Sequence, residues 1–175
     1  RSSDLLCADD LRRLADFGMA QDAQIFLQPG GVHSVHPLRD DYPALGFNLA
    51  EYGIRFEFKP LDFIQVNASL NAAMITRAIA LLQPTAEDVV LDLFCGLGNF
   101  ALPLAQRVRE VVADEGVASM VQRAQDNARA NDLQNVQVYQ GICPVRYRQQ
   151  SGGKKGLPPY CWIRHATVRW KSFGK

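Results

Sequence analysis

One run of apolar residues limits the fold more than any other feature of this sequence. Residues 89–94 (VVLDLF) are almost entirely apolar, as expected of a β-strand that is buried on both faces. Gly96 and Gly98 follow the run directly, and an apolar stripe at helical spacing begins at Phe100. A buried strand, a glycine turn and a helix in this order predict the first strand of a parallel α/β sheet.

Helices and strands alternate on both sides of this run. The further expected elements are helices with stripes at Leu70, Met74, Ala78 and Leu82 and at Val117, Val121, Ala124 and Ala128, and short strands at residues 110–113 and 136–139. The sequence therefore predicts an α/β fold, the first half of a doubly wound domain, over residues 61–140. Its sheet stops after three strands, so we expect the chain to end within this domain.

The first 60 residues follow a different pattern. Asp9 and Asp10 are expected to cap a short helix that ends near Gly18. Residues 46–49 and 54–58 alternate between apolar and polar side chains, which is typical of an antiparallel hairpin. We therefore expect residues 1–60 to be part of a small α+β domain, and the missing initiator Met indicates a cut end.

The composition limits the class of protein. Hydrophobic residues make up 47% and charged residues 21%, which is typical of a globular protein. No apolar run approaches the roughly 20 residues that span a bilayer. The cysteines, Cys7, Cys95, Cys143 and Cys161, have no metal-ligand or disulfide spacing. We therefore expect no metal, no membrane contact and a monomeric protein in the reducing cytoplasm.

The carboxyl ends of the first two parallel strands predict a nucleotide-type site. Glu115 follows Gly96 by 19 residues, and an acid at about 20 residues binds a ribose hydroxyl in nucleotide-binding α/β domains. Asp114 is expected to be the solvated acid of the pair. Ala101 stands where a dinucleotide fingerprint has its third glycine. Because S-adenosylmethionine has no phosphate to hold, the turn suits it better than NAD.

Two separated motifs carry a family resemblance. Residues 62–67 (DFIQVN) and 92–100 (DLFCGLGNF), followed by Glu115, resemble the RNA uracil-5-methyltransferases. The resemblance covers about residues 5–140. The sequences of the two motifs are more similar to those of the branch that modifies 23S ribosomal RNA than to those of the tRNA branch. It implies a Rossmann-like methyltransferase domain that uses S-adenosylmethionine to form 5-methyluridine in 23S ribosomal RNA.

The resemblance also implies the site residues. The expected S-adenosylmethionine-binding residues are Gln65, Phe94, Gly96, Gly98, Asn99 and Glu115. No catalytic residue is expected, because the family's nucleophile is a cysteine in a Ser-Cys-Asn-Pro motif that this sequence lacks, and Cys95 is interpreted as a packed thiol. The iron–sulfur cluster of the family is not supported either, because Cys7 is the sole cysteine ahead of Cys95.

Residues 141–175 form a basic tail that differs sharply from the rest. They hold eight of the 19 Lys and Arg, both Trp and none of the 18 Asp and Glu. Basic and aromatic residues together favour an RNA-binding tail. A shifted reading frame explains the abrupt change in composition better than an RNA-binding tail does. Back-translation of residues 160–170, read one base earlier, permits Leu-Leu-Asp-Pro-Pro-Arg-Asp-Gly-Ala, which contains the family's Asp-Pro-Pro-Arg motif.

We therefore interpret residues 141–175 as the product of a one-base frameshift near Gln140, either a sequencing error or a lesion in the gene. The alternatives left open are a tRNA-modifying relative, a fragment of a nicotinamide-dependent oxidoreductase and a non-catalytic RNA-binding fragment. The sequence does not identify the methylated uridine, and it does not tell whether the chain folds or binds cofactor alone.

Overall fold

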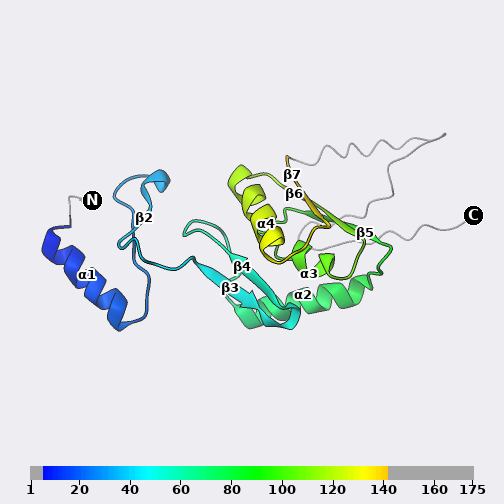
Figure 1. Ribbon diagram of the computed structural model, residues 1–175, viewed down its shortest axis with the longest axis horizontal. Helices are drawn as coiled ribbons and strands as arrows, with labels where there is room; N and C mark the ends of the chain where they lie inside the picture. Colours follow the sequence, from blue (N-terminus) through cyan, green and yellow to red (C-terminus); the bar gives the residue numbers. More distant parts are fainter. Residues whose placement is uncertain (1–5, 142–175) are drawn as a thin grey trace, which may run out of the picture. The chain divides into compact units, whose positions relative to one another are not determined.

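The computed structural model describes residues 6–141, which divide into two compact units (Figure 1). The first unit contains the described part of residues 1–45 together with 58–62. The second unit contains residues 46–57 and the described residues from 63 onwards. Apart from Gly141, the tail with the predicted frameshift lies outside the described residues, and so does the alternative of an RNA-binding tail.

The first unit holds helix α1 (Ala8–Ala20) and a short antiparallel pair, β1 (Phe26–Leu27) and β2 (His36–Pro37), with the 3-10 turn η1 (Val32–Ser34) between these strands. The N-cap of α1 is Cys7, and the Asp10 carboxylate accepts its backbone N–H at 3.1 Å. Asp10 therefore acts at the third helical position and not as the N-cap. The helix also continues two residues beyond Gly18.

The second unit is built on a parallel sheet of β5 (Val89–Leu93), β6 (Glu110–Glu115) and β7 (Val136–Gln140), in that order. Helix α3 (Ala101–Ala105) connects the first two strands and α4 (Ala118–Ala130) the last two. The predicted alternation is confirmed. Because the strands are parallel, the turn after β5 and the acid that ends β6 lie at the same edge of the sheet.

An antiparallel hairpin of β3 (Gly46–Leu49) and β4 (Ile54–Glu57), joined by the 3-10 turn η2 (Ala50–Tyr52), belongs to this second unit. Its two strands lie where the sequence predicts them, although the sequence analysis grouped them with residues 1–60. The Phe47 and Phe56 rings stack with centroids 5.0 Å apart, and Phe56 is completely buried. The hairpin therefore contributes apolar side chains to the core of the unit that contains the sheet.

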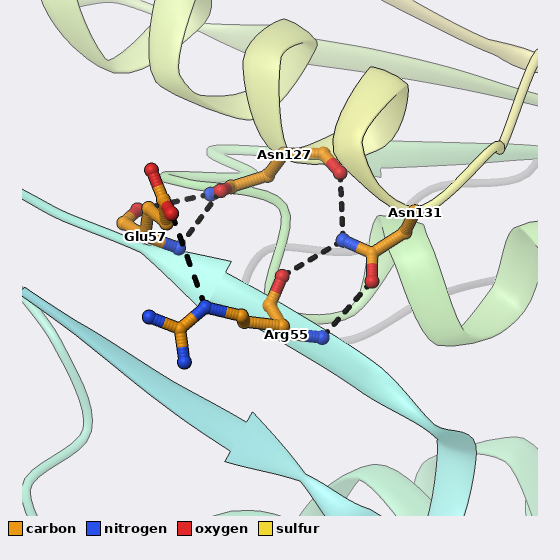
Figure 2. A network of polar contacts seen from close by, with 4 residues as sticks. All are labelled: Arg55, Glu57, Asn127 and Asn131. Carbon is orange, nitrogen blue, oxygen red and sulfur yellow. Dashed lines mark hydrogen bonds and ion pairs between the residues drawn. The ribbon is translucent and has the colours of Figure 1, made fainter. Parts of the chain in front are cut away.

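Two asparagines of α4 bind the backbone of β4 (Figure 2). Asn127 accepts the Glu57 N–H at 2.9 Å and donates to the Glu57 carbonyl at 3.2 Å. One turn later, Asn131 accepts the Arg55 N–H at 2.9 Å and donates to the Arg55 carbonyl at 2.7 Å. Each side-chain amide satisfies the groups that a peptide of a neighbouring strand would satisfy, so helix α4 fixes the position of the hairpin.

Helix α2 (Ala68–Leu82) begins at Asn67, whose side chain accepts the Leu70 N–H at 3.0 Å. Its buried face consists of Asn71, Ala72, Ile75 and Ile79. The predicted helix is confirmed, but the apolar stripe that indicated it is not the buried face, since Leu70, its first member, is 56% exposed. The helix is apolar almost all round, so periodicity alone does not decide which face it buries. Among residues 6–141, no helix combines the length and apolar character needed to cross a membrane.

Candidate cofactor site

The turn between β5 and α3 has an unusual backbone. Phe94, Gly96 and Gly98 adopt φ angles of 61°, 57° and 97°. A Cβ atom on Gly98 would lie 2.3 Å from Leu102 Cδ1, so this position has neither the backbone freedom nor the room for a side chain. Phe94 is not a glycine, and its left-handed conformation marks local strain of the kind that is found at ligand sites.

The carboxylate of Glu115 holds this turn from the end of the neighbouring strand. One oxygen accepts the Gly96 N–H and the other accepts the Val117 N–H, each at 3.0 Å. Each oxygen of an ionised carboxylate has room for a further donor. The adjacent Asp114 is only 6% exposed, so the expectation that it is the solvated acid is wrong. It lies on the central strand of the sheet, where both faces are covered.

A cavity of about 190 Å³ opens beside the turn. Its walls come from the hairpin, from residues 63–65 and from the carboxyl end of β5; the lining side chains include Phe47, Phe63, Gln65, Asp92, Phe94 and Asn99. Of the predicted site residues, Gln65, Phe94, Gly96 and Asn99 line this cavity. Gly98 and Glu115 are not among its walls, and they shape the turn that forms it.

Asp92 is a feature of the site that the sequence analysis missed. Its carboxyl group is buried at the end of β5, the Ala101 N–H donates to it, and burial raises its pKa to about 7. Asp92 lines the cavity, and its buried Oδ2 atom has no hydrogen-bond partner among the described residues. An acid inside an otherwise apolar strand was the available signal, because such a group is desolvated.

Cys95 lies in the turn but is unsuited to nucleophilic chemistry. Its side chain is buried, and burial, together with the nearby carboxylates, raises the pKa of its thiol above the ordinary value. Since the thiolate is the reactive form, this thiol is inert. The interpretation of Cys95 as a packed side chain is confirmed. Within residues 6–141, His, Cys, Asp and Glu side chains form no group able to hold a metal ion.

The fold is Rossmann-like, with a parallel sheet whose strands are connected by helices. It is shared by Pyrococcus abyssi tRNA (uracil-54, C5)-methyltransferase in complex with S-adenosyl-L-homocysteine, at TM-score 0.52 and 18% identity over 66% of this chain and 30% of that one. It is also shared by Pyrococcus horikoshii TYW2 in complex with MeSAdo, at TM-score 0.53 and 16% identity over 74% and 46%. These likenesses concern the fold alone.

The chain belongs to the tRNA (uracil-5-)-methyltransferase family, whose model matches residues 10–142. It is 52% identical over 152 residues to the 23S rRNA (uracil(1939)-C(5))-methyltransferase RlmD of Xanthomonas campestris, covering 87% of this chain and 34% of that protein. It is 54% identical over 143 residues to RlmD of Stenotrophomonas maltophilia, covering 82% and 32%. The chain thus spans about a third of the length of these relatives.

Proposed function

We propose that the chain binds S-adenosylmethionine in the cavity beside the β5 turn, as part of an enzyme that forms 5-methyluridine in 23S ribosomal RNA. The observation that carries the proposal is the convergence of Gln65, Phe94 and Asn99 on one cavity at the carboxyl end of a parallel sheet. The names and the identity of the relatives from Xanthomonas and Stenotrophomonas support the choice of substrate.

The chemistry of the cavity fits this cofactor. S-adenosylmethionine carries a sulfonium and an ammonium group, and Asp92, whose Oδ2 has no partner among the described residues, places a carboxyl group at the cavity wall. The half-exposed Phe94 ring offers an apolar surface to the adenine. Glu115 holds the turn and keeps acceptor capacity for ribose hydroxyls. A cationic ligand with a flat base therefore suits these walls better than a dinucleotide pyrophosphate, which needs donors.

The contribution of this chain to the reaction is to bind and to orient. The bound cofactor supplies the methyl group. The strained Phe94 turn and the Asn99 amide fix the position of a ligand in the cavity, and the apolar walls exclude water. By the family resemblance, the cysteine that adds to uracil and the base that removes the C5 proton belong to motifs that this sequence does not contain.

The partner implied by the relatives is 23S ribosomal RNA, and the target uridine has to leave its stack to reach a cofactor in this cavity. We propose a monomeric protein in the cytoplasm, where ribosomal RNA is its substrate. A tRNA uridine is the second candidate, because the matching family model is described by tRNA methylation. Methyl transfer by the complete enzyme to purified 23S ribosomal RNA and to unmodified tRNA separates the two substrates.

Replacing Glu115 tests the cofactor site. The Glu115→Gln change removes the charge that accepts two backbone N–H groups, and we expect at least tenfold weaker binding of S-adenosylmethionine. Isothermal titration of the full chain measures this. Glu110→Gln, at the other end of the same strand, is the matched control and should bind normally. Absence of binding by the native chain, or competition by NAD, would contradict the proposal.

We also propose that residues 141–175 come from a one-base frameshift near Gln140. The charge break and the hidden Asp-Pro-Pro-Arg motif support this, and the family match ends at residue 142, close to the break. Resequencing the source DNA across the codons for residues 136–175 is expected to show one base gained or lost. Transcripts that reproduce the given frame would exclude a sequencing error, and the tail would then need testing for salt-dependent RNA binding.

A further inference from the structure

Asn99, a wall of the cavity, is held by a partner from another element. Its Nδ2 donates to Asn71 Oδ1 at 2.8 Å, and its Oδ1 accepts from Asn71 Nδ2 at 2.9 Å. Asn71 lies on the buried face of α2 and is only 2% exposed. The two side chains therefore form a closed amide pair that joins the helix to the turn, 28 residues apart in sequence.

The pair restricts what Asn99 presents to the cavity. A primary amide has two N–H donors and two acceptor lone pairs, so the pair uses one donor and one acceptor of each side chain. One N–H and one lone pair of Asn99 remain for a ligand. If the Asn99 amide turned over alone, its N–H groups would face those of Asn71 and its oxygen would face an oxygen. Rotation of Asn99 by itself is therefore disfavoured.

The burial of Asn71 needs an explanation that packing does not supply. Helix α2 has apolar residues on every side, and an apolar side chain at this position would fill the core without the desolvation that a buried amide requires. The described hydrogen bonds of the Asn71 side chain all go to Asn99. The amide thus acts on one residue of the cavity wall and on no backbone group of the helix or sheet.

We infer that Asn71 is a positioning residue for cofactor binding, which fixes the orientation of the Asn99 amide before the ligand arrives. This inference rests on the proposed binding of S-adenosylmethionine. Because Asn71 lies behind the turn and does not line the cavity, its effect on the ligand passes through Asn99. Replacing Asn71 should weaken binding while the protein stays folded.

Three variants of the full chain test the inference. Asn71→Leu keeps the branched shape of the side chain but removes the pair, and we expect about tenfold weaker S-adenosylmethionine binding, since one oriented hydrogen bond to the ligand is lost. Ile75→Val, one turn further along the buried face, is the matched control. It should lower the unfolding midpoint in urea and leave the dissociation constant unchanged.

Asn71→Asp adds a readout that a purely structural role would not produce. A protonated carboxyl group has one O–H donor and one carbonyl acceptor, so it can replace the amide in the pair, whereas the ionised form has no donor. The ratio of variant to native dissociation constants should fall towards one at pH 5.5 and reach about ten at pH 8. Taking the ratio at each pH cancels the titration of Asp92, which both proteins share.

The outcomes separate this inference from the proposed function. If the native chain binds S-adenosylmethionine and the folded Asn71→Leu variant binds it equally well, the positioning role is wrong. If the native chain does not bind it, the cofactor proposal fails, and NMR of the Asn99 side-chain amide decides whether Asn71 orients Asn99. Slow amide-proton exchange in the native chain that becomes fast in Asn71→Leu supports it, and equal exchange in both overturns it.

Discussion

Replacing Asn127 by Leu is expected to lower the free energy of unfolding of the chain by about 3 kcal/mol, because three backbone groups, all at least partly buried, lose their partner. The Asn127 side chain is 1% exposed and accepts the Glu57 N–H. It donates to the carbonyls of Glu57 and Leu97, each at 3.2 Å. Leucine has the same branching as asparagine but no hydrogen-bonding group, so the variant removes all three hydrogen bonds at once. Urea unfolding followed by circular dichroism gives the value.

Asn131→Leu provides the matched comparison. Asn131 makes the same pair of bonds to the backbone of Arg55, one turn along the same helix, but it lies at the helix end and is partly exposed (Figure 2). Water can replace its amide, so we expect a loss of about 1 kcal/mol. Equal losses for the two variants would show that burial does not set the strength of these contacts.

Asn127 also connects the hairpin to the cofactor turn, because Leu97 lies between its two glycines. With Asn71 of α2 bound to Asn99, the turn is held from two helices by two buried amides. A side-chain amide suits this task because it satisfies backbone groups as a peptide does and carries no charge to bury. The strained backbone of Phe94 therefore sits within a turn that is fixed from both sides.

The parallel sheet and the glycine turn could be predicted from the sequence, because each rests on local information. The apolar run of β5 reports burial on both faces, and the glycines mark positions where a side chain is disfavoured. The position of Glu115 follows from parallel topology, which brings the ends of adjacent strands to one edge. The family motifs then identified Gln65 and Asn99 as candidate binding residues, and both line the cavity.

The buried asparagines could not be predicted in the same way. Hydropathy places Asn71 and Asn127 on exposed helix faces, since an amide is buried only where a specific partner compensates for lost water. Those partners, Asn99 and the backbone of Glu57, lie 28 and 70 residues away in the sequence. Periodicity reports which residues are apolar, and tertiary contacts decide which face is covered.

The stability of the native chain is expected to fall between pH 4 and pH 7 because of one carboxyl group. Burial raises the pKa of Asp92 from 3.8 to about 7. A group whose pKa is higher in the folded state stabilises the fold fully below the unfolded pKa, and this contribution is lost as the pH rises through the folded pKa. The shift corresponds to roughly 4 kcal/mol of unfolding free energy. Urea unfolding at intervals of pH measures the slope.

Asp92→Asn should remove that slope, so the variant is expected to be more stable than the native chain at pH 8 and nearly equal to it at pH 4. Asp126→Asn is the control. The pKa of Asp126, an exposed carboxyl group, is lowered by its hydrogen bond to Arg129, so its small contribution has the opposite sign and disappears as the pH falls. A native chain whose stability does not change between pH 4 and pH 7 would contradict this account of Asp92.

Asp92 destabilises the fold at neutral pH, and its place at the cavity wall suggests that it contributes to ligand binding instead. Above its pKa, Asp92 places a negative charge with an unpartnered oxygen beside the proposed site of a cationic ligand. Binding of a cationic ligand would restore part of the unfolding free energy that is lost when Asp92 ionises. The Asp92→Asn change, which stabilises the chain without ligand, should therefore weaken S-adenosylmethionine binding at pH 8. Gains in stability without any loss of affinity would place Asp92 outside the cofactor site.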